Sequence, residues 1–313
     1  MPPVGAVLAV RVVVVTFGSG EVLGGFLGSL PKATDRPYEV VVVDNSPLLD
    51  EGTAAAAARP EVRLLRSGAN LGYGTAANRG AEGAVADWLL VANPDVLLRP
   101  GTLDTLIDAA GRWPRAAAFG PALVTDGALY PSARELPSLR RGIGHALLGW
   151  WWPSNPWTAG YRNERGEPRE GPAGWLSGAC LLVRREAFEA VGGFDESYFM
   201  FLEDVDLCRR LGEAGFASVY VPSAVATHLL GHATRRVSRQ MLRAHHASMY
   251  RYLSRRYAGR RWAPVRLVLR VGLAARLLLA SVSRHAAEGG APTRSADLLA
   301  AAAPAPAPRN SQP

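Results

Sequence analysis

The 313-residue sequence contains one lysine, Lys32, and two cysteines, Cys180 and Cys208. Two cysteines are too few for a disulfide framework, and their spacing is not that of a metal site, so a reducing cytosol is the expected compartment. No run of 18 or more uncharged apolar residues occurs, so no segment is expected to span a bilayer. The stretch MPPVGAVLAVRVVVV has no basic start and carries Arg11 among apolar residues, which disfavours a secretory signal.

A net positive charge is also missing from most of the chain, because the excess of basic residues lies at one end. Residues 209–313 hold 17 arginines and three acidic residues, a formal charge of +14, whereas residues 1–208 hold 18 basic and 24 acidic residues, a charge of −6. A basic block of this kind implies an anionic neighbour, either nucleic acid or the headgroups of a membrane leaflet. Nucleic-acid binding would need basic residues interleaved with aromatics on a recognisable module, and no such module is present. A nucleic-acid partner is therefore not expected.

Apolar runs typical of buried strands alternate with helical spacing over the first hundred residues. Strands are expected at 10–17, 38–46, 62–67 and 88–93, and helices at 21–30, 53–58, 78–85 and 101–113. This order predicts stacked βαβ units, that is, an α/β fold with a mainly parallel central sheet flanked by helices. In such sheets the ligand lies beyond the carboxyl ends of the strands.

The pattern loosens further along the chain. Residues 127–175 are rich in Pro, Gly, Arg and Trp without a sustained period, which predicts a long functional loop region. Regularity returns with a strand and a helix that ends at Gly192-Gly193, a helix that starts near Glu203, and a short strand at 218–222. Mostly helical, Arg-rich segments follow to about residue 285, and residues 289–313 are expected to form a disordered tail.

Asn93-Pro94-Asp95 comes directly after one of the expected strands. Pro and Asp are ordinary turn residues, since Pro fixes φ and Asp can cap the helix that follows. The place at a strand's carboxyl end also suits a ligand. One carboxylate can hold Mg²⁺ or Mn²⁺ where phosphate oxygens and water supply the other ligands. The residues by themselves leave both interpretations open.

Two further strand ends carry candidate nucleotide contacts. Asp44 either forms an Asx turn or accepts hydrogen bonds from a base or ribose. The stretch GANLGYGTAANRG (68–80) supplies Gly72 and Gly74, which let the backbone approach a ligand, and Asn78 on the helix that follows. Because this stretch lacks the dinucleotide fingerprint and the lysine of a P-loop, neither NAD, FAD nor P-loop binding is indicated.

Glu203 and Asp204 stand where a helix is expected to begin. Capping explains acidic residues there, but the same place favours the ionised carboxylate that a general base needs near neutral pH. One of the two could accept a proton while the other orients a substrate or caps the helix. His228 taken alone is an ordinary loop histidine.

The predicted helix at 263–285 places Arg266, Arg270 and Arg276 among Leu and Val. Such a helix either lies flat on an anionic bilayer or packs on the core with a solvated face. The tryptophans at 150–152 favour the membrane interpretation, because Trp prefers the headgroup level.

Taken together, several stretches between about residues 10 and 260 resemble the GT-A-fold, family 2 inverting glycosyltransferases. They are VVVVTF, VVVDNS, GANLGYGTAANRG, VANPDV, WLSGACLLVRREAFEAVGGFDESYFMFLEDVDLCRRL and SVYVPSAVATH. The stretches LYPSARELPS (129–138), NPWT and GWLSG are similar to an actinobacterial branch of rhamnosyltransferases that makes the cell-wall linker. The resemblance implies a GT-A domain over 1–235, with a nucleotide-binding half at about 8–100 and an acceptor half at about 101–235. A basic amphipathic, membrane-associating helical region would follow at 236–288.

The resemblance also assigns roles to residues. It implies that Asp204 is the general base, that Asp95 is the metal-binding member of the family's Asp-any-Asp motif, whose first Asp is Asn93 here, and that His228 is a further ligand of Mg²⁺ or Mn²⁺. The residues expected to bind the nucleotide sugar are Thr16, Phe17, Asp44, Asn70, Gly72, Tyr73, Gly74, Asn78, Asn93 and Asp95. Those expected to shape the sugar and acceptor site are Trp175, Ser177, Gly178 and Glu203.

The same branch implies the substrates. L-rhamnose would pass from dTDP-L-rhamnose to the 3-position of the GlcNAc of a polyprenyl diphosphate, at the inner leaflet on the cytoplasmic side of the cell membrane. A family 2 enzyme with another donor or acceptor, and a non-catalytic nucleotide-sugar or lipid-binding module, remain alternatives. A sugar-phosphate nucleotidyltransferase would need a basic pyrophosphate loop, and TFGSGEVLGG has no basic residue. The pattern contains no information on the oligomeric state.

Overall fold

The computed structural model describes residues 8–138, 168–229 and 239–288, the last range with its side chains from 241 to 276. The tryptophans at 150–152 and the expected tail at 289–313 lie outside the described residues.

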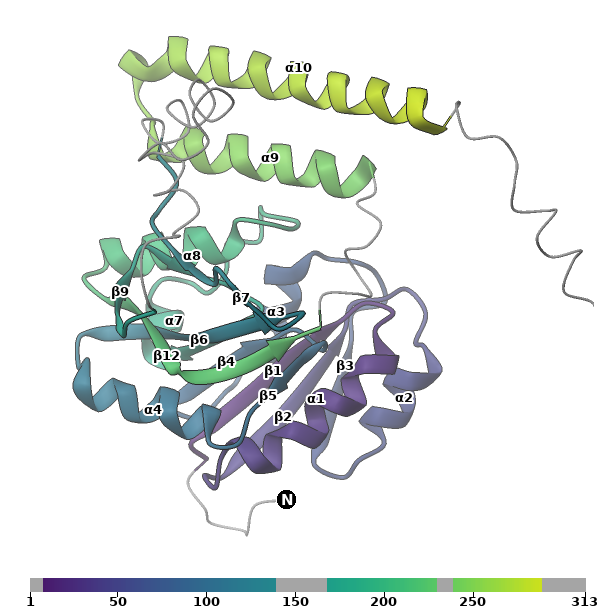
Figure 1. The fold of residues 1–313 in the computed structure, drawn as a ribbon, viewed down its shortest axis with the longest axis vertical. Coiled ribbons are helices and arrows are strands. Elements are labelled where there is room, and N and C mark those ends of the chain that lie inside the picture. The colour runs from purple at the N-terminus through teal and green to yellow at the C-terminus, as the bar shows by residue number, and fades with distance from the viewer. Residues whose placement is uncertain (1–7, 139–167, 230–238, 289–313) are drawn as a thin grey trace, which may run out of the picture.

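A large sheet runs through the body of the molecule (Figure 1). Its strands are β1 Val10–Thr16, β2 Tyr38–Asp44, β3 Val62–Arg66, β4 Trp88–Ala92, β5 Val96–Leu98, β6 Ala116–Thr125, β7 Ala128–Tyr130, β9 Gly171–Ala173, β11 Cys180–Arg184 and β12 Ala217–His228. Within the described residues the order is β3-β2-β1-β4-β11-β6-β12-β5, with β7 beside β6 and β9 beside β12. Strands β1 to β4 run parallel and so do β6 and β12, whereas β11 runs antiparallel to β4 and β6. The predicted mainly parallel sheet is confirmed.

Helices cover both faces of this sheet. The helices are α1 Gly20–Ala33, α2 Glu51–Ala57, α3 Tyr73–Ala81, α4 Thr102–Arg112, α7 Arg185–Ala190 and α8 Glu203–Glu213. Helices α1 and α4 share one core cluster with Val12 and Val14, whereas α3, α7 and α8 share the opposite cluster with Val13 and Val15. Successive residues of a strand point to opposite faces, so a strand buried on both sides reads as an unbroken valine run. Cys180 and Cys208 are buried and free, as expected for core residues.

Two elements differ in length from the sequence expectation. Helix α3 begins at Tyr73 instead of Asn78 and ends at Ala81 instead of residue 85, since Gly72 at φ +89° starts it and Gly83 at φ +65° lies in the turn after it. Strand β12 is 12 residues long instead of five. It pairs with β6, β9 and β5 in turn and passes Pro222 at a register shift between Val221 and Val225. Strand β12 is longer than expected because it pairs with strands that are distant in the chain, and the local sequence pattern carries no information on such pairing.

Short strands occupy parts of the segment 127–175 that was expected to be irregular. They are β7, β9, and the pair β8 (Ala133–Arg134) and β10 (Trp175–Leu176), which forms a separate two-stranded sheet. Strand β5 also had no signal in the sequence. Strands of two or three residues are too short to show a period, so their partners alone define them.

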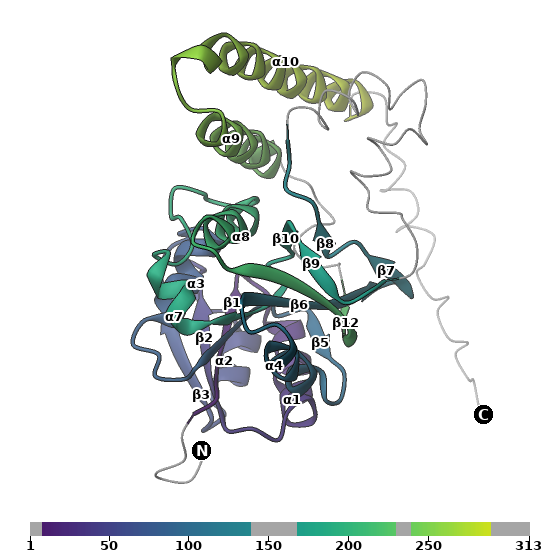
Figure 2. The same cartoon turned by 90° about the vertical axis from the view of Figure 1, so that its left-hand side faces the viewer.

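The C-terminal part forms two helices stacked above the body, on the side of α8, as Figures 1 and 2 show. These are α9, Arg239–Arg256, and α10, Ala263–Glu288, joined through a 3₁₀ turn at Arg260–Trp262. The predicted Arg-rich helical segment is confirmed. Tyr252 and Leu253 of α9 pack against Tyr198, Leu202 and Val205 of the body. In the described part of the chain, none of the helices combines the length and the apolar character that a bilayer crossing requires.

Candidate active site

The strand ends predicted to bind a ligand meet at one edge of the sheet, where β1 lies between β2 and β4. Thr16 ends β1 and Asp44 ends β2, and Asn93-Pro94-Asp95 follows β4. The N–H of Asn93 donates to the carbonyl of Ala179 at 2.9 Å, just before β11 enters the sheet from the opposite direction. The loop before β11 is thereby held beside the turn that carries Asp95. This is the place where open α/β sheets bind ligands.

Asp95 and His228 are in direct contact. His228 ends β12, where it is paired with Val96 of β5, and the N–H of Leu229 donates to the carbonyl of Asp95 at 2.9 Å. The pairing brings Nε2 of His228 to 3.2 Å from Oδ1 of Asp95, with both side chains mostly buried. The ring of Tyr130 meets the His228 ring edge-on, with 6.4 Å between the centroids.

The pair fits a small divalent ion as a partial ligand set. Ligands about 2.1 Å from one octahedral ion lie roughly 3 Å apart when they are neighbours, close to the 3.2 Å between these two atoms. Nδ1 of His228 is buried, with no hydrogen-bond partner within the part that the structure describes. The described residues hold no group of three or more His, Cys, Asp or Glu side chains suited to a metal. An ion here would therefore take further ligands from a substrate or from water.

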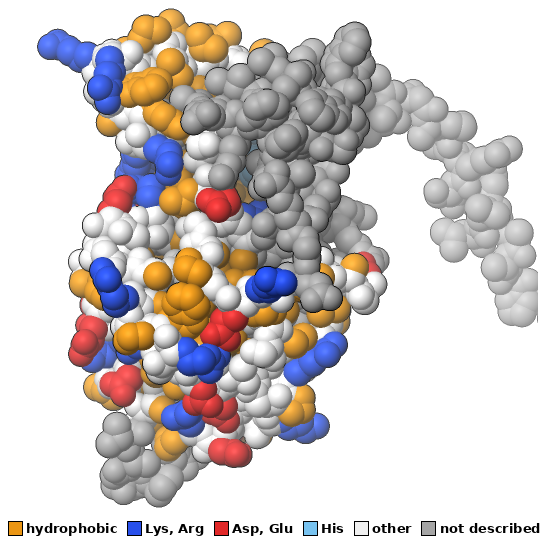
Figure 3. All heavy atoms as spheres, turned by 60° about the vertical axis from the view of Figure 1, so that its left-hand side comes forward, with side chains coloured by type: hydrophobic (Ala, Val, Ile, Leu, Met, Phe, Trp, Pro, Cys, Tyr) orange, Lys and Arg blue, Asp and Glu red, His pale blue; other side chains and the backbone are white. Residues whose placement is uncertain are grey.

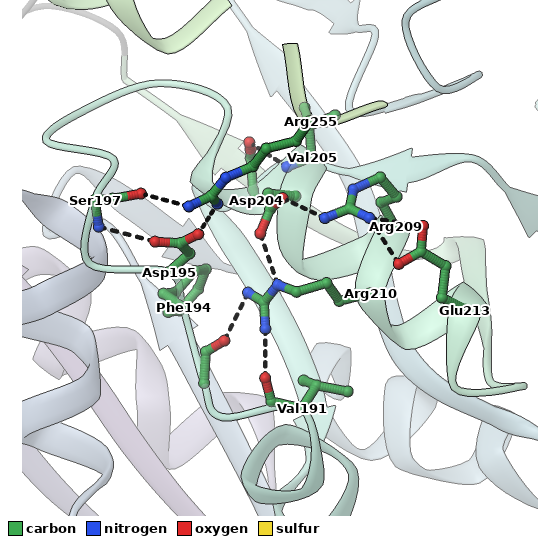
Figure 4. A network of polar contacts seen from close by, with 12 residues as sticks. Val191, Phe194, Asp195, Ser197, Asp204, Val205, Arg209, Arg210, Glu213 and Arg255 are labelled. Atoms are coloured by element: carbon green, nitrogen blue, oxygen red, sulfur yellow. Dashed lines mark hydrogen bonds and ion pairs between the residues drawn. The ribbon is translucent and has the colours of Figure 1, made fainter. Parts of the chain in front are cut away.

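Asp204, the second residue of α8, is held by two backbone N–H groups. Gly178 donates to Oδ2 and Val205 to Oδ1, each at 2.8 Å; Figure 4 shows the latter bond. A Cβ on Gly178 would come within 3.3 Å of the Cβ of Asp204, so glycine permits this close approach. Burial raises the pKa of Asp204, whereas the two N–H bonds and the nearby Arg134 oppose the rise. The residue is partly buried, and the two N–H groups fix the direction of its carboxylate.

Glu203 has the opposite surroundings. It is buried, and its Oε2 has no hydrogen-bond partner among the described residues. Burial and the neighbouring Asp204 carboxylate raise the pKa of Glu203 to about 8. Because hydrogen-bond donors stabilise the ionised form, the negative charge of the pair resides on Asp204 near neutral pH, and Glu203 keeps its proton.

Tyr73 connects the loop before β11 with the loop before α8. Its hydroxyl donates to the carbonyl of Gly178 at 2.7 Å, and its N–H donates to the carbonyl of Phe199 at 3.1 Å. Burial raises the pKa of Tyr73 well above its ordinary value, and the carboxyl groups of Glu203 and Asp204 add to the rise. The phenol therefore remains a hydrogen-bond donor.

Asn45 follows the end of β2, and the sequence analysis assigned it no role. Its Nδ2 donates to Oδ1 of Asn70 at 3.1 Å and to the carbonyl of Gly72 at 3.2 Å, and its Oδ1 accepts from the N–H of Leu71. These bonds hold the Gly-rich loop beside the end of β2. The signal was available, since Asn45 directly follows Asp44 in the stretch VVVDNS.

The side chains of the other predicted nucleotide contacts differ in exposure and in hydrogen bonding. Thr16 is fully buried and Phe17 is 52% exposed. Asp44 is buried, accepts from the N–H of Ser46 at 3.1 Å and pairs with Arg66 at 3.3 Å, so the Asx turn is present. The side-chain amide of Asn78 is bonded to both backbone groups of Phe194. It joins α3 to the loop before α8.

The predicted acceptor residues Trp175, Ser177 and Gly178 form β10 and the loop after it. The guanidinium of Arg134 lies over the Trp175 ring, with 5.8 Å from Cζ to the centroid. The N–H of Ser177 donates to the carbonyl of Ser132 at 2.8 Å. The stretch LYPSARELPS, which contains Arg134, thus lies beside the loop that binds Asp204.

Residues 11–192 match the family model described as Glycosyl transferase family 2, and residues 160–247 match Glycosyltransferase like family 2. The chain belongs to glycosyl transferase family 2. This family 2 chain is 54% identical over 277 residues to the N-acetylglucosaminyl-diphospho-decaprenol L-rhamnosyltransferase of Mycobacterium tuberculosis, which covers 85% of the chain and 90% of the relative. It is 31% identical over 264 residues to Rhamnosyltransferase WbbL of Escherichia coli, covering 79% of the chain and 93% of the relative.

Two solved structures share the fold at low identity. The mannosyltransferase PcManGT from Pyrobaculum calidifontis, in complex with GDP-Man and Mn²⁺, superposes with a TM-score of 0.53 at 17% identity, over 93% of this chain and 78% of that one. GalNAc-T7 with UDP, GalNAc and Mn²⁺ superposes with a TM-score of 0.56 at 15% identity, over 85% of this chain and 54% of that one. The predicted GT-A fold, the glycosyltransferase activity and the resemblance to rhamnosyltransferases are confirmed.

Proposed function

We propose that this glycosyltransferase moves L-rhamnose from dTDP-L-rhamnose to the 3-position of the GlcNAc of a polyprenyl-diphosphate acceptor, in cell-wall linker synthesis. The observation that carries the proposal is the 54% identity, over 85% of the chain, to a relative named for rhamnosyl transfer to N-acetylglucosaminyl-diphospho-decaprenol. The convergence of Asp95, His228 and Asp204 at one edge of the sheet supports a catalytic role over mere binding.

Asp204 is the proposed general base of a direct displacement at the anomeric carbon. Its carboxylate is held by the N–H groups of Gly178 and Val205. It would take the proton from the attacking sugar hydroxyl. Glu203, protonated near neutral pH and with an unpaired Oε2, would bind a hydroxyl of the sugar or acceptor beside it. Trp175 and Ser177 would complete this side of the site.

Asp95 and His228 are the proposed protein ligands of Mg²⁺ or Mn²⁺. A metal bound there would neutralise charge on the departing nucleoside diphosphate. The contact between the carboxylate and the imidazole supports this assignment, as does the Mn²⁺ present in the two solved structures with the same fold. Asn93 would hold the loop or contact the nucleotide.

The nucleotide is proposed to lie across the carboxyl ends of β1 and β2. Phe17 offers an exposed aromatic ring next to the end of β1, which suits stacking on a base. The remaining proposed contacts to the nucleotide sugar are Thr16, Asp44, Asn70, Gly72, Tyr73, Gly74 and Asn78.

The C-terminal helices are proposed to attach the enzyme to the inner leaflet, on the cytoplasmic side. Leu267, Val268 and Val271 of α10 are 60–70% exposed, and Arg270 lies among them. Figure 3 shows apolar and basic side chains together at the end of the molecule where α9 and α10 lie. A helix with this composition inserts its apolar face among lipids while its arginines bind anionic headgroups. The lipid-linked acceptor would then be within reach.

A donor screen with a synthetic GlcNAc-diphospho-lipid tests the function. Labelled dTDP-L-rhamnose is expected to give a labelled lipid product in the presence of Mg²⁺ or Mn²⁺, and UDP- and GDP-hexoses much less. Preferred transfer from another donor would replace the substrate assignment with a different family 2 activity. Donor binding without any transfer would indicate a non-catalytic binding module.

A further inference from the structure

The loop before α8 adopts a strained backbone just ahead of Glu203 and Asp204. Phe201 and Leu202 have φ angles of +68° and +64°, the left-handed region that residues with a Cβ seldom occupy. Two such residues in succession persist only where surrounding contacts determine them, and strain of this kind gathers at functional sites. The contacts that hold this loop therefore decide where Asp204 is presented.

One face of α9 supplies many of those contacts. The ring of His245 lies edge-on to Phe201, with 5.5 Å between the centroids, and Oγ of Ser248 donates to the carbonyl of Met200 at 2.8 Å. Tyr252 packs with Tyr198 and Leu202 in a shared apolar cluster.

The same face reaches the start of the loop through Arg255, which bonds to Asp195 and Ser197, as Figure 4 shows. Positions 245, 248, 252 and 255 are three or four residues apart, so they lie on one side of the helix. This side of α9 covers the strained loop from end to end.

The opposite side of the loop is held by the start of α3. The N–H of Tyr73 donates to the carbonyl of Phe199 at 3.1 Å. A Cβ on Gly72 would come to 2.3 Å from the Phe199 carbonyl oxygen, and the φ of Gly72 is +89°, so only glycine permits this approach. Tyr73 also bonds to Gly178, the residue that donates to Asp204. The loop is thus clamped between the nucleotide side of the site and α9.

We propose that α9 holds the active-site loop before α8 in place, and that Ser248 is a positioning residue for the base Asp204. The inference rests on the proposed role of Asp204 and goes beyond it, since α9 would otherwise serve only to attach the enzyme to the membrane. Ser248 ties the carbonyl of Met200 to the helix and so holds the turn from which α8 begins. Loss of that bond lets the strained segment relax and displaces the Asp204 carboxylate from the acceptor hydroxyl.

The test uses the full-length chain and an acceptor that needs no membrane. Ser248→Ala, Ser248→Thr and Ser254→Ala are compared on a water-soluble, short-chain GlcNAc diphosphate without vesicles. Ser254 is a matched control on the same helix, because its Oγ has no hydrogen-bond partner among the described residues. With Ser248→Ala, kcat is expected to fall about two- to tenfold while the KM for dTDP-L-rhamnose stays unchanged. Ser248→Thr restores most of kcat, and Ser254→Ala retains it. An unchanged kcat in Ser248→Ala overturns the proposal.

Hydrogen–deuterium exchange tests the same contact without reference to the chemistry. Backbone amides of residues 196–204 are expected to exchange faster in Ser248→Ala than in wild type and Ser254→Ala, at equal thermal midpoints. Equal exchange in all three proteins overturns the positioning role, even if Asp204 is the base. Conversely, Asp204→Asn with substantial turnover would refute the proposed base, while the exchange data would still report on the contact between Ser248 and the loop.

Discussion

Oδ1 of Asp95 lies 3.2 Å from Nε2 of His228, although the two residues are 133 positions apart in the chain. The contact exists because β5, which directly follows Asp95, pairs antiparallel with the last residues of β12. Two residues that were each open to an ordinary interpretation thus become one candidate metal site.

His228→Ala is expected to weaken metal-dependent donor binding by more than tenfold, because one of two protein ligands is removed. Titration calorimetry of dTDP with and without Mn²⁺ measures the effect, and Asp95→Ala should behave alike. His246→Ala, which alters a histidine on α9 outside the pair, serves as the control. If the His228 variant kept the full Mn²⁺ dependence, the ligand assignment would be wrong.

Asn93→Asp is expected to tighten Mn²⁺ binding severalfold with activity retained, because it adds a carboxylate two residues before Asp95. Calorimetry and initial rates measure the two effects separately. Loss of activity despite tighter metal binding would show that the Asn93 amide itself is needed.

Asp204→Asn is expected to lower kcat by about 10²- to 10⁴-fold, the usual range for loss of a general base. Affinity for dTDP should stay near that of wild type, since Asp204 would act on the acceptor. Asp108→Asn, an exposed acid on α4, is the control with the same change of charge. Turnover close to wild type in Asp204→Asn would remove Asp204 from this role.

Glu203→Gln is expected to change how stability depends on pH. The pKa of Glu203 in the folded protein is raised to about 8 from an ordinary 4.5, so the folded state retains a proton that the unfolded chain releases. The contribution of Glu203 to stability therefore falls as pH rises between these values. The amide cannot ionise, so the variant should gain roughly 1 kcal/mol or more relative to wild type between pH 5 and pH 9. Urea unfolding at the two pH values measures the gain, and parallel pH dependences would contradict it.

Val268→Glu combined with Val271→Glu is expected to release the protein from anionic vesicles, because two exposed apolar side chains of α10 become charged. Vesicle co-sedimentation measures the loss. Leu48→Glu alters an apolar residue that is 84% exposed on the body and should leave binding unchanged. Equal sedimentation of the α10 variant and wild type would exclude this face as the membrane contact.

Much of the nucleotide side of the fold was predictable from local patterns. The valine runs of β1 and β2 are buried on both sheet faces and therefore carry no polar alternation. Helices α1, α4 and α8 also begin close to the predicted residues. Strands β5, β8 and β10 could not be predicted, since they are too short for a period and depend on distant partners.

Within the candidate site, the sequence predicted roles for Asp95, Asp204 and His228, whereas it assigned no role to Asn45, Arg134 or the face of α9 that contains Ser248. The three identified residues stand in motifs that resemble those of a family. Asn45 and Arg134 lie in the stretches VVVDNS and LYPSARELPS, but the order of residues in these stretches does not reveal which groups the two side chains contact. The residues of the α9 face recur at a spacing of three and four. The role of a polar residue such as Ser248 in that face depends on its bond to the carbonyl of Met200, which only the structure shows.

The sequence by itself determined the class of sheet, the family and the asymmetry of charge, because burial periodicity, motif residues and composition are all local properties. The tertiary structure alone decided which groups meet: Asp95 with His228, Asp204 with the backbone of Gly178, and α9 with the strained loop before α8. The physical reason is that each of these contacts joins segments distant in the chain through strand pairing, a backbone hydrogen bond or helix packing. The energy of such a contact depends on the folded geometry, which no short stretch of residues specifies.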